Sequence, residues 1–397
     1  MRYVVTIHAI VSLFFSVFLN AQTSSSITIS GYVFDDLNSN GVRDAKEKGL
    51  KDVSVSDQVN VVTTNDEGLY QIKYAGSYGI LFVSVPTAYQ SEKTFWQRVD
   101  TTSTKSQINF PLRKRVTSTG TFTFIQASDT HVSESSLDRM QKFRNIVDSV
   151  KPDFVIITGD LVRDALRVPE TEATRLYELF LTEINKTTAP VWLVPGNHEI
   201  FGIERHLSLV SQQNSLYGRK MYRHYFGPDY YSFNYGGIHF IGLNSLEFED
   251  LWYYGRIDSI QLEWLKKDVA TVSVTTPIVT FQHVPFYSGG FSMMPFEEDG
   301  LARSTVREHG VLQYRHVVSN TQDVLAILQS HNYPLALAGH YHFQQKFSLE
   351  GLATRFEQTA AVVGPTEQGI VKMPSGVTVY HVKGQKIDEG KFIRLDK

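Results

Sequence analysis

The stretch "LVPGNHE", residues 193–199, begins as an apolar strand and then sets an amide, an imidazole and a carboxylate side by side. The same pattern occurs twice earlier, in "TFTFIQASDTH" (121–131) and "PDFVIITGD" (152–160). The segments between these strands, "SSLDRMQKFRNIVDSV" and "ETEATRLYELFLTEIN", have the apolar spacing of amphipathic helices. Alternating strands and helices predict an α/β fold, which places its active site at the carboxyl ends of the strands.

Metal-binding residue types gather at five predicted strand ends, the last two being "FQHVP" and "AGHYH". A single buried histidine is more often a structural residue held by a hydrogen bond. Five strand ends that all deliver carboxylate, amide or imidazole groups instead predict a metal site, and such ligands suit Zn, Fe or Mn better than Mg alone. The residues are Asp129, His131, Asp160, Asn197, His198, His283, His340 and His342.

Composition limits the class of protein. The chain has 397 residues, 42% of them hydrophobic, which is enough for two domains with separate cores. A net charge of -3 argues against nucleic-acid binding through bulk charge. Since there is no cysteine, disulfides, thiol nucleophiles and thiolate metal sites are excluded.

Residues 1–21 are typical of a signal peptide, with Arg2 before an apolar run and Ala21 at a cleavage position. We therefore expect a secreted, periplasmic or cell-surface bacterial protein whose mature chain begins at Gln22 and has no membrane span. The alternative is an N-terminal membrane anchor, because the apolar run is close to the shortest length that crosses a bilayer. The oligomeric state is left open.

Residues 27–112 are expected to form a small β-sandwich, since short apolar strands alternate there with Gly, Asn and Asp turns. Within it, "DLNSNGVRDAKE" (36–47) has the spacing of a calcium-binding loop, with Gly41 at the sharp turn. The alternative is a polar turn that binds nothing. The expected calcium ligands are Asp36, Asn38, Asn40, Val42, Asp44 and Glu47. A basic connector follows, and residues 119–397 are expected to form the second domain.

The ordered motifs D-x-H, G-D, G-N-H-E, H and G-H-x-H, from about residue 121 to 343, resemble those of the calcineurin-like metallophosphoesterases. The segment 27–112 resembles the β-domain that precedes some secreted bacterial members, and also the calcium-binding B-type modules of surface proteins. The resemblance implies a four-layer α/β/β/α sandwich that hydrolyses a phosphate mono- or diester by attack of a metal-bridging hydroxide. It also implies one metal held by Asp129, His131, Asp160 and His342, and a second held by Asp160, Asn197, His283 and His340.

In the family the histidine after the metal-binding Asn acts on the leaving group, which implies a catalytic role for His198. A buried carboxylate would keep this imidazole protonated, and Asp164 is either that carboxylate or a solvated residue at a helix start. Glu199 is expected to support the site rather than bind metal. Arg163 stands where the similar purple acid phosphatases place a metal-binding Tyr, which argues against a purple Fe(III) centre.

A long segment after His283 is expected to be a substrate-binding loop or lid, because long loops are usually functional. Its candidate substrate contacts are Tyr287, Arg303 and Arg307, with His309 and Arg315 as further candidates. Strands after His342 are expected to close the second sheet. The alternative function is an envelope binding or adhesion protein that uses the β-module, with the phosphoesterase fold as a scaffold.

Overall fold

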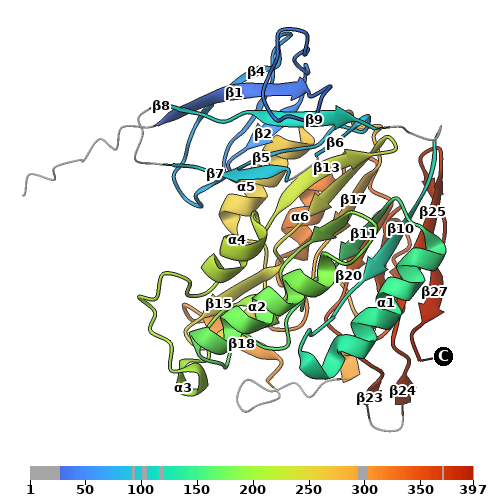
Figure 1. The fold of residues 1–397 in the computed structure, drawn as a ribbon. Coiled ribbons are helices and arrows are strands. Elements are labelled where there is room, and N and C mark those ends of the chain that lie inside the picture. Colours follow the sequence, from blue (N-terminus) through green and yellow to red (C-terminus); the bar gives the residue numbers. More distant parts are fainter. Residues whose placement is uncertain are drawn as a thin grey trace, which may run out of the picture.

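The computed structural model describes residues 27–91, 94–100, 105–115, 120–293, 303–368 and 371–396. The predicted signal peptide, residues 1–21, lies outside the described residues. The chain forms a smaller N-terminal β-module and a larger α/β part packed against it (Figure 1). Within the part of the chain that is described, no helix has the length and apolar character needed to cross a membrane.

The N-terminal module consists of two sheets that pack face to face. One has the order β4-β1-β9-β6 with β8 added to β1, and the other has the order β3-β2-β5-β7. The strands are β1 (Thr28–Asp35), β2 (Ser54–Ser56), β3 (Val61–Thr63), β4 (Leu69–Lys73), β5 (Ile80–Val83), β6 (Tyr89–Gln90), β7 (Trp96–Arg98), β8 (Lys105–Gln107) and β9 (Phe110–Lys114). Alternate residues of β1 and β4 are buried, as expected for strands with one face on a core. The prediction of a β-sandwich is confirmed, while the proposed domain boundaries stay a prediction.

The larger part contains two six-stranded sheets. The first has the order β12-β11-β10-β25-β26 with β27 added to β25, and the second has the order β13-β14-β17-β20-β22-β21. The strands of the first sheet are β10 (Thr121–Ala127), β11 (Phe154–Ile157), β12 (Val191–Leu193), β25 (Gly376–Lys383), β26 (Lys386–Ile387) and β27 (Lys391–Arg394). Those of the second are β13 (Tyr231–Tyr235), β14 (Ile238–Gly242), β17 (Ile278–Phe281), β20 (Leu335–Ala338), β21 (Gln345–Ser348) and β22 (Arg355–Gln358).

Helices cover the outer faces of the two sheets, with α1 and α2 on one side and α5 and α6 on the other (Figure 1). The helices are α1 (Leu137–Val150), α2 (Glu170–Ile184), α3 (Arg205–Ser208), α4 (Lys220–Phe226), α5 (Ser259–Val269) and α6 (Thr321–Leu328), with short 3-10 turns η1 (Glu134–Ser136), η2 (Asn197–Glu199) and η3 (Gly289–Met293). Three hairpins complete the part: β15 (Leu246–Glu249) with β16 (Trp252–Gly255), β18 (Thr305–Glu308) with β19 (Val311–Tyr314), and β23 (Thr366–Gln368) with β24 (Val371–Met373).

Aromatic side chains fill the space between the two sheets. The ring of Phe240 on the second sheet lies 5.8 Å from Phe124 and 5.3 Å from Phe154, both on the first sheet. Phe154 also meets Phe233 edge-on at 5.6 Å. Such ring contacts add to the free energy that burial of apolar surface already provides. The predicted α/β/β/α sandwich is confirmed.

The prediction for the C-terminal strands is wrong in part. Strands β21 and β22 do extend the second sheet, but β25 pairs antiparallel with β10 and carries β26 and β27 into the first sheet. Both sheets offer an edge to an apolar strand with the same alternation, so the pattern of the strand predicts its existence but not its partner.

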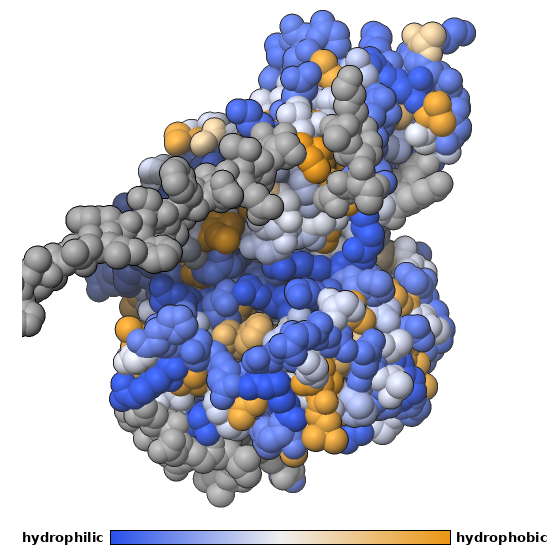
Figure 2. Space-filling model, turned by 90° about the vertical axis from the view of Figure 1, so that its left-hand side faces the viewer, coloured by the Kyte–Doolittle hydropathy of each residue, from blue (hydrophilic) through white to orange (hydrophobic). Residues whose placement is uncertain are grey.

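The module and the α/β part share a buried interface. Gln58 donates to Asp229 at 3.0 Å, and the hydroxyl of Tyr230 donates to the carbonyl of Gln58. The indole of Trp264, on α5, donates to Ser56 at 3.1 Å. The outer surface of the molecule differs from this buried interface. Figure 2 shows a face of the molecule on which hydrophobic residues are scattered among hydrophilic ones.

Candidate metal centre

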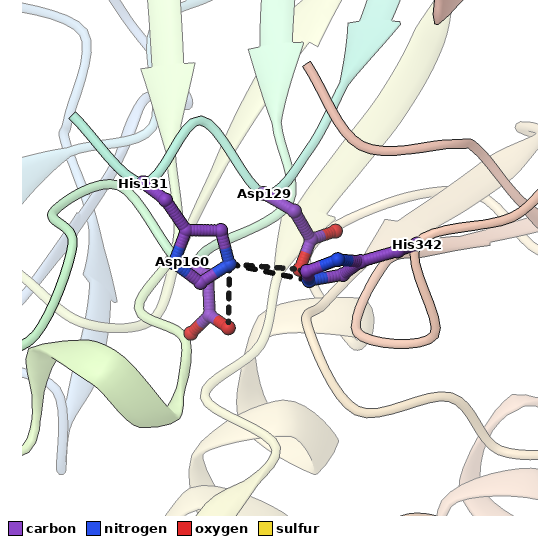
Figure 3. Close-up of side chains that lie close together, drawn as sticks. All are labelled: Asp129, His131, Asp160 and His342. Carbon is purple, nitrogen blue, oxygen red and sulfur yellow. Dashed lines mark hydrogen bonds and ion pairs between the residues drawn. The ribbon is translucent and has the colours of Figure 1, made fainter. Parts of the chain in front are cut away.

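The predicted metal ligands meet at the carboxyl ends of strands from both sheets. Asp129 and His131 follow β10, and Asp160 follows β11. Asn197 begins η2 after β12, while β17 and β20 of the second sheet are followed by the remaining histidines. The acidic and imidazole side chains form two groups that share Asp160. The first group is Asp129, His131, Asp160 and His342 (Figure 3), and the second is Asp160, His283 and His340.

In the first group the donor atoms converge on one point. The Nε2 atoms of His131 and His342 lie 3.2 Å apart. The Nε2 atom of His342 is also 3.2 Å from Oδ1 of Asp129, and Oδ2 of Asp160 is 3.6 Å from Nε2 of His131. Oxygen and nitrogen atoms at these separations can all reach one divalent ion at ordinary ligand distances.

The second group is arranged around the Nε2 atom of His283. This atom lies 3.3 Å from Oδ2 of Asp160, 3.1 Å from Nδ1 of His340 and 3.1 Å from Oδ1 of Asn197. The Nδ1–H group of His283 donates to the carbonyl of Thr158 at 2.8 Å, which leaves its Nε2 atom to face the other donors and to bind a metal ion. Asn197 therefore joins the second group, as the sequence predicted.

These residues fit a pair of divalent ions. Nε2 of His283 and Nδ1 of His340 face each other at 3.1 Å, and a divalent ion bound by both would take the place of a shared proton. Oδ1 of Asp129 is buried and accepts no hydrogen bond of good geometry, so a metal ion would provide the partner that this oxygen needs. Hard oxygen and imidazole donors without any thiolate are the set that Mn, Fe and Zn accept.

The backbone at the site is strained. Asp129, His131, Asp160, His340 and His342 all have φ between +39° and +77°, a region that non-glycine residues rarely adopt. Such conformations cost free energy and cluster where function requires a fixed geometry. These backbone conformations direct side chains from different strand ends toward one point.

Glu199 holds two of the ligand loops together, the supporting role that the sequence predicted. Its side chain is 1% exposed, and it accepts hydrogen bonds from Leu161 at 2.8 Å, Val162 at 3.0 Å and Gly196 at 2.6 Å. A side chain at Gly196 would not fit, since a Cβ atom there would lie 2.2 Å from the backbone nitrogen of Asp160. The two loops therefore pack with backbone against backbone.

Burial and charge act against each other at the centre. Burial lowers the pKa of His131 to about 3, with a further contribution from the neighbouring His198, so this imidazole is neutral and can donate its lone pair. Burial also lowers the pKa of His283, but the carboxylate of Asp160 outweighs it and raises the value to about 9. Burial raises the pKa of Glu199 to about 8, and the charge of Asp160 adds to this effect. The carboxylates thus favour positive charge at the point where the two groups meet.

His198 borders the metal groups without belonging to either. Its Nδ1–H donates to the carbonyl of Arg163 at 2.5 Å, and its Nε2 lies 3.8 Å from Oδ2 of Asp160. The expected pairing with Asp164 is not found: that carboxylate binds the guanidinium of Arg167 at 3.0 Å and accepts from the backbone of Leu166. Asp164 is three residues before Arg167, so a local ion pair forms in preference to one with the imidazole.

A pocket of about 690 Å³ opens above the metal groups. The three residues predicted to bind substrate do not line it. Tyr287 stacks on Phe347, Arg303 lies over the ring of Trp252, and Arg307 donates to a turn carbonyl. Besides the metal groups, the lining consists of Ser133, Ser135, Arg163, Asp164, His198, Tyr253, His316, Tyr341, Val363 and Thr366.

Sequence reasoning missed most of these lining residues. Tyr253 comes from the β15–β16 hairpin and His316 from the segment after β19, both far along the chain from the motifs. Arg315, a further candidate, contacts the ring of Tyr253 at 4.3 Å and so supports the wall. Among the missed residues, Ser133 and Ser135 come shortly after the D-x-H motif and Tyr341 lies inside "AGHYH", so these three had a signal in the sequence.

The predicted calcium loop has a defined shape. Gly41 donates to Oδ2 of Asp36 at 2.8 Å, while Glu47 accepts from Leu37 and Asp44, both at 2.9 Å. Among the described residues, groups of three or more acidic or imidazole side chains with converging donor atoms are found only at the carboxyl ends of the strands. The carboxylates of the predicted calcium loop do not form such a group. Calcium binding stays a prediction.

Comparison with known families agrees with this geometry. Residues 122–344, more than half of the chain, match the family described as calcineurin-like phosphoesterase. The chain belongs to the calcineurin-like phosphoesterase family. Residues 37–115 match a second family, described as the N-terminal part of calcineurin-like phosphoesterases. The phosphoesterase core and the β-module are therefore both known parts of one protein family.

The relatives of this phosphoesterase differ in their described activities. A probable cyclic nucleotide phosphodiesterase from Fibrobacter succinogenes is 23% identical over 57% of this chain and 74% of its own length. Purple acid phosphatase 15 from Arabidopsis thaliana is 29% identical over 34% of this chain, and a human serine/threonine-protein phosphatase is 29% identical over the same share. The chain spans 29% of the plant protein's length and 41% of the human protein's length.

Two solved structures are similar at low identity. A dimetal phosphatase from Danio rerio is 14% identical, with a TM-score of 0.44 over 69% of this chain and 99% of its own. A structure described as PhoD is 10% identical, with a TM-score of 0.47 over 86% of this chain and 81% of its own.

Proposed function

We propose that this phosphoesterase hydrolyses a phosphate mono- or diester with two divalent ions, Mn, Fe or Zn, bound side by side. The observation that carries the proposal is the shared position of Asp160, which belongs to both ligand groups. Two ions about 3.5 to 4 Å apart repel each other, and a carboxylate between them reduces that repulsion. The pair would supply the charge that holds a phosphate and activates a water molecule.

The protein's own side chains have distinct roles in this proposal. Because Nδ1–H of His198 is held by the carbonyl of Arg163, its Nε2 atom is left to face the pocket. When protonated, this nitrogen can donate to the leaving-group oxygen as a general acid. Arg163 lies at the pocket wall, where its positive charge favours an anionic ester.

The direct test is an assay of the chain from Gln22 onward on an aryl phosphate monoester and the matching diester, with added Mn²⁺. Hydrolysis that a chelator removes and Mn²⁺ restores is the expected result. The ratio of the two rates then assigns the enzyme as a phosphatase or a phosphodiesterase. Absence of hydrolysis together with no bound metal by mass analysis would contradict the proposal.

We also propose export, on the basis of the signal-peptide pattern of residues 1–21. Expression of the full chain in a bacterial host tests this, because cleavage would give a soluble product that begins at Gln22. A product that keeps Met1 and sediments with membranes would favour the anchor instead.

Calcium binding by residues 36–47 is a further part of the proposal. Oδ1 of Asp36 is buried and has no hydrogen-bond partner, while its Oδ2 is held by Gly41. The unpartnered oxygen is available to a cation, and Glu47 supplies the carboxylate at the last position of the loop. Calcium should raise the melting temperature of the wild type but not of Glu47→Ala, and an equal rise in both proteins would contradict calcium binding here.

A further inference from the structure

One histidine outside the family motifs touches the metal centre. His316 lies between β19 and α6 and lines the pocket. Its Nδ1 atom is 2.7 Å from Nε2 of His340, and the two rings lie edge to edge with centroids 5.0 Å apart and planes inclined by 22°. His340 therefore has both ring nitrogens engaged, Nδ1 toward His283 and Nε2 toward His316.

Nε2 of His283 and Nδ1 of His340 face each other at 3.1 Å in the second ligand group. A metal ion bound there would take the lone pairs of both atoms. The proton of His340 would then reside on Nε2, where it can be donated to Nδ1 of His316 at 2.7 Å. The ring of His316 in turn forms a hydrogen bond with the backbone of Arg303. This places the proton of His316 on its other nitrogen.

The segment that carries His316 is held in place on both sides. Arg315 donates its backbone N–H to Ser304 at 2.8 Å, and Val318 donates to Pro285 at 2.9 Å. Ser319 donates to Gly255 at 2.8 Å. The backbone around His316 is thus held at three neighbouring positions. Because this backbone is already ordered, the His316 side chain loses little further entropy when it orients His340.

We propose that His316 is a positioning residue that holds His340 with Nδ1 directed at the second metal position. The inference rests on the proposed function. Histidine ligands in metal sites usually donate their outer N–H to a carboxylate or a carbonyl, and loss of such a partner lowers metal affinity about 10- to 100-fold. Here a second imidazole takes that place, supplied by the long segment after β17 rather than by the strand ends.

The test is a titration of metal-free protein with Mn²⁺ by calorimetry, with the EPR signal of a magnetically coupled Mn²⁺ pair as a second readout. His316→Ala should bind one ion as the wild type does and the second about 10- to 100-fold more weakly, with loss of the coupled signal. His316→Asn should recover much of the second affinity, since its side-chain oxygen lies near the position of Nδ1. His309→Ala, an exposed histidine of the same segment, should match the wild type.

Each outcome decides the matter. If His316→Ala binds both ions with wild-type affinity, or loses both ions equally, the positioning role is wrong. Recovery of the second affinity in His316→Asn excludes a mere folding defect, because the smaller Asn side chain restores the hydrogen-bond acceptor but not the volume of the ring. If the wild type itself binds no pair of ions, the proposed function fails along with the inference, whereas a change confined to the variants leaves the proposed function intact.

Discussion

The interface between the β-module and the phosphoesterase core depends on one buried carboxylate. Asp229 is 0% exposed and accepts four hydrogen bonds. Two come from the guanidinium of Arg223 at 2.8 Å, one from Gln58 of the module at 3.0 Å and one from Asn244 at 2.9 Å. Asp229→Asn keeps the volume but replaces one acceptor oxygen by an NH₂ group that faces two donors.

The expected loss is large. Two hydrogen bonds to a charged group are lost, each worth about 1.5 to 3 kcal/mol. The guanidinium of Arg223 is left buried without its counter-charge, and breaking such a pair costs about 3 to 5 kcal/mol. Since both estimates describe the same contacts, we expect the free energy of unfolding to fall by about 4 kcal/mol.

Urea unfolding followed by tryptophan fluorescence measures this loss. Asp66→Asn is the matched control, because Asp66 forms an exposed ion pair with Lys51 and should change stability by less than about 1 kcal/mol. Gln58 ties the module to the same carboxylate, so we expect the module and the core of the wild type to unfold in one transition. A loss below 1 kcal/mol in Asp229→Asn would refute the reasoning.

The pH dependence gives an independent check. Burial raises the pKa of Asp229, but Arg223, Arg219 and the hydrogen bond from Gln58 together outweigh burial, so the pKa is lowered overall. A lowered pKa in the folded state means that the carboxylate stabilises the fold above its unfolded pKa of about 4 and loses this effect as the pH falls through the folded value. The difference between wild type and Asp229→Asn should therefore be constant from about pH 6 to 8 and shrink only below about pH 4. A difference that grew toward acid pH would be the wrong sign.

Three further predictions concern the metal centre. Asp160→Asn should abolish turnover and weaken metal binding at both positions, and near-normal activity would contradict the shared ligand. His198→Ala should keep two metals per chain but lose about 10²- to 10⁴-fold in rate, most for poor leaving groups, as kinetics and metal analysis would show. Gly196→Ala should reduce the content of both metals, since its Cβ would meet the backbone of Asp160; unchanged metal content would show that the loops can move apart.

The sequence was sufficient to predict which side chains lie together because of where each of them stands in the chain. A strand such as β11 is buried and apolar along its whole length, so the polar group that follows it marks the end of the strand. Parallel strands of one sheet end at the same edge, and the residues that follow are thereby brought together. The shared position of Asp160 was implied by the family resemblance, and strand order alone does not give it.

The sequence could not predict contacts made between distant segments. His316 meets His340 across 24 residues, and neither the spacing nor the residue types around His316 indicate a metal site. For Asp164 the sequence left two alternatives, a partner for His198 or a solvated residue, and the structure pairs it with the guanidinium of Arg167 instead. The sheet that β25 joins was predicted wrongly, since strand pairing depends on which sheet edge is available.

The strained backbone at the metal centre is held in place by strands of both sheets. Five ligand residues with positive φ cost about 1 kcal/mol or more each, and such conformations persist only where the surroundings fix them. Here the fixing elements are the fully buried strands β11, β17 and β20. These strands cannot shift without exposing apolar surface, so the strain stays in the loops that follow them. One part of the pocket wall, by contrast, comes from the β15–β16 hairpin, which carries Tyr253 and no predicted metal ligand. Substrate preference can therefore change in this hairpin while the ligand geometry remains the same.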